Sequence, residues 1–483
     1  MSTNISAKIW SFCDTLRDDG LGYGDYLEQL TYLLFLKMAD ENKGLSVIPK
    51  GCDWETLKAS KPESIRATYE QALDKLGDSG GMLAKIFSDA RNRIYDSVKL
   101  KRLIELIDEQ DWTSTEIDVK GEIYESLLQR NAENSGAGQY FTPRPVIQAM
   151  VECIEPKVGE SISDPSCGTG GFFLGALDYL NRGKLTENQK NKLKFETFKG
   201  WEIETSTARL CLMNLYLHGI GDLKQTPEII VSDSLKQTPE KQVDIILANP
   251  PFGISSSDVP TPDDKLAKKD GYFLRSDFWV TTSNKQLAFL QHIYTMLDKN
   301  GRAAVVLPDN VLFDTAGIEI RKELLQRTNL HTILRLPSGI FYAQGVKANV
   351  LFFEIKANSQ KPATKEIWYY DYRTNIKHSP KRNPLRFENL QPFIELYKSK
   401  KRKETWAETT EETASPEGRW RKYQYQEIIS NEKVNLDITW LRDDNMINLE
   451  NLPEPEELAN DIVENLRAGL ESFESVIKEL KEN

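Results

Sequence analysis

The sequence predicts an α/β domain with a mostly parallel sheet, preceded by a helical region and followed by a charged one. Residues 1 to about 130 carry apolar side chains at helical spacing. From about residue 140, short runs of Val, Ile and Leu alternate with helical stretches, which is typical of strands joined by crossover helices. After Lys356 the sequence becomes charged and irregular. We therefore expect three segments, at residues 1–130, 131–356 and 357–483.

Length and composition favour a soluble chain with more than one domain. The 483 residues exceed what one core normally holds, and 39% are apolar while 28% are charged. The apolar stretch Leu30–Leu36 has charged neighbours, so we expect a buried helix rather than a membrane span. Five cysteines without a CxxC pair and four scattered histidines favour the reducing cytoplasm and predict no metal site. The net charge of −11 argues against a chain that alone binds nucleic acid over its whole surface.

The two regular regions can be divided further by their periodicity. In the N-terminal region we expect helices at 63–76, 81–95 and 98–109. In the α/β region seven apolar runs are expected to be strands buried on both faces: Ser161–Asp164, Phe198–Ile203, Ile229–Ser232, Val243–Ala248, Ala303–Pro308, Thr332–Leu336 and Asn349–Ile355.

Three segments outside this pattern leave alternatives open. Residues 254–284 are polar and have no periodicity, so this loop is either functional or disordered. The basic run "KSKKRK" at Lys398–Lys403 is either a solvated loop or a phosphate contact. Pro453–Asn483 form a predicted helix whose apolar stripe covers either this chain's own core or a partner.

A glycine-rich turn marks the first strand of the α/β region. The stretch "SISDPSCGTGGFFLGAL" predicts a strand that ends at Asp164 and a helix that begins near Phe172. Between them, Gly168, Gly170 and Gly171 lack Cβ atoms, so the backbone can approach a ligand closely. The pattern is not GxGxxG, and a plain strand–helix connection is the alternative.

An acidic residue ends each of three successive predicted strands. Asp164, Glu202 and Asp233 would line one nucleoside cleft outside the carboxyl ends of the strands. Glu202 is placed to accept hydrogen bonds from both hydroxyls of a ribose, and Asp233 from an adenine amino group. Each acid taken alone is equally explained as a helix cap or a solvated strand end.

Two further stretches flank this cleft. In "GAGQYFTPRPVIQAMVECI", Thr142 is the expected N-cap of a helix and Pro143 its first residue. The rings of Tyr140–Phe141 at its start suit a cationic sulfonium, although a capped helix without a ligand would look the same. Downstream, "NPPF" at Asn249–Phe252 follows an apolar strand.

"DPSCGTGGFF" followed by "NPPF" resembles the amino-group DNA methyltransferases that use S-adenosylmethionine. With "GQYFTPRPV" and the helical region before it, the chain resembles the modification subunits of type I restriction–modification systems. These are gamma-class enzymes that methylate adenine at N6. The resemblance implies a Rossmann-like methyltransferase domain with a seven-stranded mixed sheet, preceded by an all-α N-terminal domain and followed by a C-terminal helical region.

The resemblance also implies the site residues. The target-adenine site would be Asn249, Pro250, Pro251 and Phe252. No metal is required. The expected contacts of the cofactor S-adenosylmethionine are Gln139, Tyr140, Phe141, Thr142, Pro143, Arg144, Asp164, Thr169, Gly170, Gly171, Glu202 and Asp233.

The chemistry explains why this tetrapeptide is rigid. The lone pair of an adenine amino group is delocalised into the ring, so two acceptors aimed at its hydrogens would favour the nucleophilic, pyramidal nitrogen. The Asn249 side-chain oxygen and the Pro250 carbonyl are these acceptors, and proline holds them still. Phe252 would stack on a base rotated out of the duplex. Cys167 is interpreted as a small turn residue, not a nucleophile.

Only about 125 residues follow the expected catalytic region, and they look unlike a base-reading domain. We therefore expect a separate specificity subunit. The resemblance to the family further implies two modification subunits per specificity subunit, a restriction/translocase subunit, and double-stranded DNA as substrate. The alternatives are N4-cytosine methylation, methylation of a protein glutamine or of RNA, a non-catalytic cofactor-binding scaffold, and a nicotinamide-dependent dehydrogenase.

Overall fold

The computed structural model describes residues 23–41, 48–109, 142–252, 275–341, 346–356, 361–379, 383–406 and 416–441, with only the backbone described for 23–27. Residues 1–439 form one compact unit and 440–483 another. All helices and strands named below belong to the first unit. The predicted helix at 453–483 lies outside the described residues.

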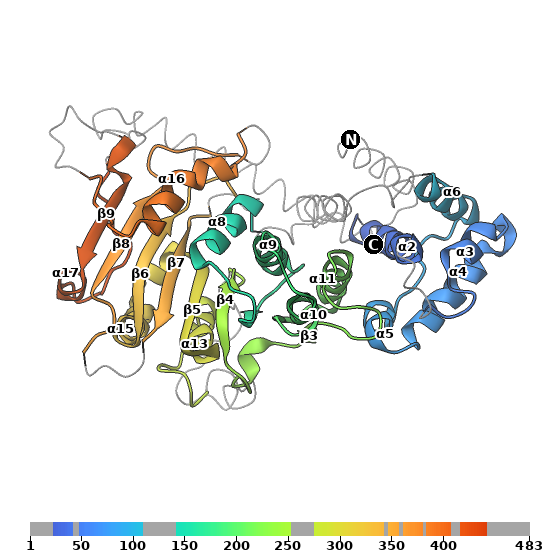
Figure 1. Cartoon of the computed structure of the whole chain (residues 1–483), viewed down its shortest axis with the longest axis horizontal. Helices are drawn as coiled ribbons and strands as arrows, with labels where there is room; N and C mark the ends of the chain where they lie inside the picture. Colours follow the sequence, from blue (N-terminus) through green and yellow to red (C-terminus); the bar gives the residue numbers. More distant parts are fainter. Residues whose placement is uncertain are drawn as a thin grey trace, which may run out of the picture. The chain divides into compact units, whose positions relative to one another are not determined.

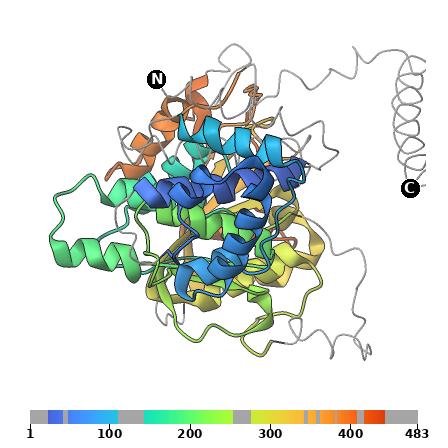
Figure 2. The same ribbon diagram turned by 90° about the vertical axis from the view of Figure 1, so that its right-hand side faces the viewer.

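Within residues 23–41 and 48–109, the described part of the N-terminal region is helical, as predicted (Figure 2). Leu30–Leu36 lie fully buried inside α2, so the expectation of a buried helix is confirmed. The helix predicted at 81–95 was too long, because α5 ends at Phe87 and Asp89 then adopts a positive φ of 56°. No helix among the described residues is long and apolar enough to cross a membrane. The helices are α2 (Tyr23–Glu41), α3 (Trp54–Ala59), α4 (Pro62–Gly77), α5 (Gly81–Phe87) and α6 (Ser97–Asp108).

Nine strands of the described chain form one sheet, in the order β3-β2-β1-β4-β5-β7-β6-β8-β9 (Figure 1). Strand β7 is antiparallel to both of its neighbours and β9 is antiparallel to β8, while the remaining pairs are parallel. The strands are β1 (Ile162–Asp164), β2 (Phe198–Glu202), β3 (Glu228–Val231), β4 (Val243–Ala248), β5 (Leu297–Pro308), β6 (Thr328–Arg335), β7 (Ala348–Ile355), β8 (Glu366–Asp371) and β9 (Trp420–Gln424).

The seven predicted runs coincide with β1–β7, and the α/β class with a mixed sheet is confirmed. The expected count of seven strands was too low, because β8 and β9 extend the sheet beyond β6. Both strands come from the charged region after residue 356. Their aromatic side chains pack on each other, as in the stacked pair Trp368–Trp420, whose ring centroids lie 5.1 Å apart. That pairing cannot be read from a run such as "WRKYQ", in which Arg and Lys separate Trp from Tyr.

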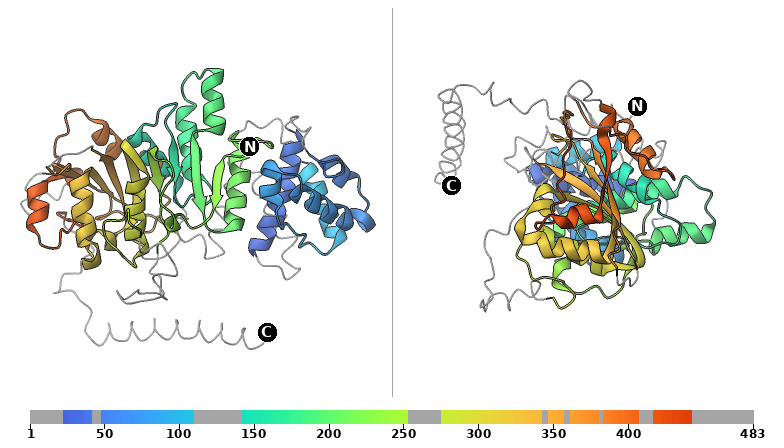
Figure 3. Two further views of the ribbon diagram at one scale, coloured as in Figure 1. Left: turned by 90° about the horizontal axis from the view of Figure 1, so that it is seen from below. Right: turned by 90° about the vertical axis from the view of Figure 1, so that its left-hand side faces the viewer.

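The direction of strand addition reverses between β1 and β4. From β1 the sheet grows through β2 to β3, and from β4 it grows the other way through β5. Helices α8, α9 and α11 cover one face, and α13 and α15 cover the other (Figure 3). In such doubly wound sheets the crevice at the reversal, outside the carboxyl ends of the strands, is where ligands bind. The helices after residue 140 are α8 (Arg144–Ile154), α9 (Gly171–Leu180), α10 (Glu187–Phe195), α11 (Thr205–Leu217), α13 (Lys285–Met296), α14 (Asp309–Phe313), α15 (Ile318–Arg327), α16 (Phe387–Lys398) and α17 (Tyr425–Ser430).

One buried arginine connects the helical region to the sheet domain. Arg209 of α11 pairs with Glu28 and donates a hydrogen bond to the Tyr32 hydroxyl, both in α2. Its second terminal nitrogen donates to the Ser88 carbonyl oxygen at 2.5 Å. Since α11 follows β2, this contact lies directly behind the crevice.

Candidate active site

The glycine turn after β1 requires glycine at two positions. Gly168 and Gly170 have φ of 53° and 84°, in the left-handed region that side chains disfavour. A Cβ atom on Gly170 would lie 3.0 Å from the Cys211 sulfur and 3.3 Å from a Leu215 methyl carbon. Gly170 is also the N-cap of α9, which begins at Gly171. The predicted strand, turn and helix are all confirmed.

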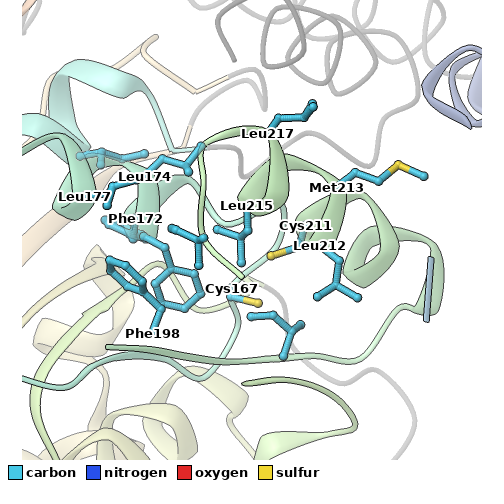
Figure 4. Close-up of a cluster of buried hydrophobic side chains, with 14 of the residues drawn as sticks. Cys167, Phe172, Leu174, Leu177, Phe198, Cys211, Leu212, Met213, Leu215 and Leu217 are labelled. Atoms are coloured by element: carbon cyan, nitrogen blue, oxygen red, sulfur yellow. The ribbon is translucent and has the colours of Figure 1, made fainter. Parts of the chain in front are cut away.

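Buried side chains of α11 support this turn from behind. Cys167 and Cys211 lie among apolar side chains (Figure 4), and their thiol groups contact each other. The neighbouring Cys211 thiol and burial raise the pKa of Cys167 well above its usual range, so the sulfur stays protonated and weakly nucleophilic. Asn214 donates a hydrogen bond to the Thr169 carbonyl oxygen at 2.9 Å. The turn is therefore held in place by packing and by a side-chain amide.

Glu202, at the end of β2, faces the same turn. Its Oε2 accepts a hydrogen bond from the Gly168 amide at 3.0 Å, and its Oε1 accepts one from the Glu204 amide at 2.9 Å. Burial raises the pKa of this carboxyl, while these two amides oppose the shift. The next residue, Ile203, has a side chain that is 62% exposed. A carboxylate and an apolar surface thus lie side by side at the carboxyl edge of the sheet.

The other two acids have different surroundings. Asp164 is buried, and burial raises the pKa of its carboxyl to about 7. It accepts hydrogen bonds from the Ser166 amide at 2.9 Å and from the Ser166 hydroxyl at 3.4 Å. A buried acid of this kind favours a cation beside it. Asp233 accepts a hydrogen bond from the Leu235 amide at 3.0 Å and so caps a short 3-10 helix, which was the alternative reading of this acid.

Asn249–Phe252 follow β4, directly beside β1 across the reversal in strand order. The Asn249 Nδ2 donates a hydrogen bond to the Thr142 hydroxyl at 2.8 Å, and the Ser166 hydroxyl lies 3.5 Å from the Asn249 backbone oxygen. Pro250 is buried and Pro251 is exposed. The Phe252 ring makes an edge contact with Phe341, with centroids 6.1 Å apart.

The predicted N-cap role of Thr142 was wrong. Helix α8 begins at Arg144, and Pro143 is its N-cap residue rather than its first helical residue. The Pro143 carbonyl oxygen accepts hydrogen bonds from the Val146 and Ile147 amides. Because the backbone makes these contacts, the Thr142 hydroxyl is available to Asn249.

Of the remaining predicted cofactor contacts, some lie together in the structure and others fall outside the described residues. Arg144, Thr169 and Gly171 come together in a small cavity between α8 and α9. Gln139, Tyr140 and Phe141 lie outside the described residues, as does most of the loop at 254–284. The end of that loop is anchored by Arg275, which is buried against Asp277 and His292.

The basic run at Lys398–Lys403 is at least partly structural. Lys398 pairs with Glu152 and Glu155 at the end of α8. Arg402 donates hydrogen bonds to the Tyr397 carbonyl oxygen and stacks on the Tyr397 ring. Because α8 ends on the way into β1, this run lies at the amino edge of the sheet, opposite Asn249. Phosphate contact by the exposed lysines of this run stays a prediction.

Four residues of the site were not found from the sequence: Ser166, Ile203, Asn214 and Phe341. Ser166 and Ile203 lie next to predicted residues. For Ile203 the sequence did offer a signal, because it is an apolar residue directly after the acid that ends a predicted strand. Asn214 and Phe341 are distant in sequence from the residues they touch, and only the fold brings them there. In the described part of the chain, no group of three or more His, Cys, Asp or Glu residues is arranged to hold a metal ion.

Comparison with known proteins decides the family. Residues 115–431 match the N-6 DNA Methylase family, and residues 5–107 match the HsdM N-terminal domain. The chain is 37% identical to the type I restriction enzyme EcoKI methylase subunit of Escherichia coli K12, over 99% of this chain and 96% of that protein. The chain belongs to the methylase subunits of type I restriction enzymes.

Further members of the family agree with this assignment. The StySPI methylase subunit of Salmonella potsdam is also 37% identical, with the same coverage. The crystal structure of the EcoKI methylase subunit aligns over 99% of this chain and 96% of its own, at 33% identity and a TM-score of 0.55. A chain from a study of type I complex assembly aligns over 99% of both chains, at 28% identity and a TM-score of 0.71. As a member of this family, the chain is an adenine-specific DNA methyltransferase subunit.

Proposed function

We propose that Asn249–Phe252 bind a flipped-out adenine and that the adjoining crevice binds S-adenosylmethionine, whose methyl group is transferred to the adenine N6. One observation carries the proposal. The tetrapeptide follows β4 and the glycine turn follows β1, and these adjacent parallel strands flank the reversal in strand order. A methyl donor and its acceptor must meet at one point, and this is where a doubly wound sheet brings two loops together.

The residues of the crevice fit this cofactor. The space beside Gly168 in the glycine turn is open, and Glu202 is fixed where it can accept hydrogen bonds from ribose hydroxyls. The exposed Ile203 offers an apolar surface for an adenine ring, and the buried Asp164 suits a cationic amino group. S-adenosylmethionine supplies an electrophilic methyl group on a sulfonium. We further assign Gln139–Phe141, Pro143, Arg144, Thr169–Gly171 and Asp233 to its contacts, on the resemblance to the family, whereas the Thr142 hydroxyl accepts a hydrogen bond from Asn249.

The protein's own groups would act on the adenine. The Asn249 Oδ1 and the Pro250 carbonyl oxygen accept hydrogen bonds from the amino group, which localises its lone pair and stabilises the positive charge that develops on nitrogen. Pro250 and Pro251 restrict the backbone, so the acceptors need not reorganise during the reaction. The Phe252 ring, steadied by Phe341, stacks on the flipped base.

The wider assembly follows from the family. We propose that the chain works on double-stranded DNA in the cytoplasm with a specificity subunit, at two methylase subunits per specificity subunit, and with a restriction/translocase subunit. Residues 1–130, 131–356 and 357–483 are proposed as its helical, catalytic and partner-binding regions. The study of type I complex assembly that contains a similar chain supports such partners.

The test is methyl transfer from labelled cofactor to duplex DNA by the complex with its specificity subunit. The wild-type complex should yield N6-methyladenine, and Asn249→Ala should lower the transfer rate by at least about 100-fold while cofactor affinity is kept. Asn329→Ala is a matched control, since Asn329 donates a hydrogen bond to Glu354 at the opposite edge of the sheet. Label in cytosine, or unchanged transfer by Asn249→Ala, would contradict the proposal.

A further inference from the structure

We infer that Thr142 is a positioning residue for methyl transfer, whose hydroxyl holds the Asn249 carboxamide with its oxygen end turned toward the target amino group. This inference rests on the proposed function of Asn249. It differs from the cofactor contact that the resemblance assigns to Thr142, because here the residue acts through another side chain.

The contact is direct and partly buried. The Asn249 Nδ2 donates to the Thr142 hydroxyl at 2.8 Å, and Thr142 is only 8% exposed. The two residues are 107 positions apart in sequence. Loss of this hydrogen bond would leave the Nδ2 donor of the half-buried Asn249 without this acceptor.

The hydroxyl is in the usual place for a helix cap but does not act as one. The Pro143 carbonyl oxygen accepts from the first amides of α8, and Pro145 has no amide hydrogen to donate. The sequence Thr-Pro-Arg-Pro thus starts a helix while leaving the threonine side chain for another partner. That partner is the residue we assign to catalysis.

The direction of the amide matters for the reaction. A carboxamide has a donor end and an acceptor end, and only the acceptor end can bind an amino group's hydrogens. With Nδ2 engaged by Thr142, Oδ1 lies at the other end of the group. The backbone of Asn249 has a second support in Ser166, which is itself hydrogen-bonded to Asp164. The residue assigned to catalysis is therefore held by Thr142, which precedes the N-cap of α8, and by the glycine turn.

The test compares Thr142→Val, which replaces the hydroxyl by a methyl group of similar size, with Thr142→Ser, which keeps the hydroxyl. Both are made in the complex with the specificity subunit. We expect Thr142→Val to lower kcat by at least about tenfold with the cofactor Kd unchanged, and Thr142→Ser to restore most of the rate. If Thr142→Val does not fold, Thr142→Ala removes the same hydroxyl without adding a methyl group next to Nδ2.

Thr328→Val is the matched control, because Thr328 is fully buried and its hydroxyl donates to the Leu324 carbonyl oxygen at the amino edge of the sheet. Its kcat should equal that of the wild type. An unchanged kcat in Thr142→Val and Thr142→Ala would overturn the inference, and so would a loss confined to cofactor Kd. A wild-type complex that transfers no methyl group to adenine would instead overturn the proposed function.

Discussion

The Gly168 amide donates a hydrogen bond to the Glu202 Oε2 at 3.0 Å, so the glycine turn and the end of β2 are joined at the mouth of the crevice. The carboxylate is thereby fixed before any ligand arrives. A preorganised acceptor costs little conformational entropy when it binds.

Glu202→Ala should therefore weaken cofactor binding. A charged group that accepts hydrogen bonds from ribose contributes enough affinity that we expect Kd to rise about 10- to 100-fold, measured by isothermal titration. Glu204→Ala is the control, because this acid is exposed and caps no amide with its side chain. A Kd in Glu202→Ala equal to that of the control would rule out the ribose contact.

Gly170→Ala should destabilise the fold. The positive φ costs about 1–2 kcal/mol for any side chain, and crowding against Cys211 and Leu215 adds about 1–3 kcal/mol. Gly51→Ala is a close control, since Gly51 has a φ of 86° and no atom within 4 Å of the added Cβ. Urea unfolding of the two variants measures the difference. Equal losses would show that the glycine turn has room for a side chain.

Arg209→Met should separate the helical region from α11. Removing one partner of a buried, hydrogen-bonded ion pair typically costs about 3–5 kcal/mol, because Glu28 and the Ser88 carbonyl lose their donor. The control Arg66→Met breaks an exposed pair with Glu70 and should cost less than about 1 kcal/mol. Thermal unfolding would measure the stability of both variants. Limited proteolysis would measure how readily each is cleaved between residues 41 and 205. Matching Tm values for the two variants would contradict the structural role of Arg209.

His292 should make stability fall in acid. Burial, followed by the charge of Arg275, lowers the pKa of its imidazole to about 3. Between its ordinary pKa of about 6.5 and this value, the unfolded chain binds a proton that the native chain does not. Stability from this group is therefore complete above about pH 6.5 and is lost as the pH falls toward 3.

His292→Gln should flatten that dependence. The expected change is up to about 1.4 kcal/mol per pH unit, from urea unfolding between about pH 4.5 and 7. A variant with the same pH slope as the wild type would show that His292 is protonated in the native state.

The sequence was sufficient for the parts of the fold that depend on local pattern. The strands β1–β7 were predicted from short runs rich in Val, Ile and Leu, and the glycine turn from three glycines in four residues. The expected burial on both faces was wrong for β3, whose first and last residues are exposed. Strands β8 and β9 were missed because they lie in the charged, irregular region after Lys356. Their stability comes from Trp368 and Trp420, which are 52 positions apart and stack on each other only in the folded sheet.

The candidate site, like the fold, was predicted from the sequence only in part. Residues within motifs were found, whereas contacts between motifs were not. Thr142 was expected to cap α8, because threonine before proline usually does so, and nothing local in the sequence indicates that Asn249 is its partner. Asp233 does cap a short 3-10 helix. The preference of such residues for helix caps is therefore followed at Asp233 and not at Thr142.

The two strands added after residue 356 bear on how the chain can be divided in the laboratory. A fragment ending at residue 356 would contain the glycine turn and Asn249, yet it would leave β6 as the border of the sheet, with its amide and carbonyl groups unpaired along Thr332–Arg335. Apolar border strands of this kind recruit other chains and aggregate. A fragment expressed to contain the catalytic region alone should therefore end after β9, and not at residue 356, where the seven predicted strands end.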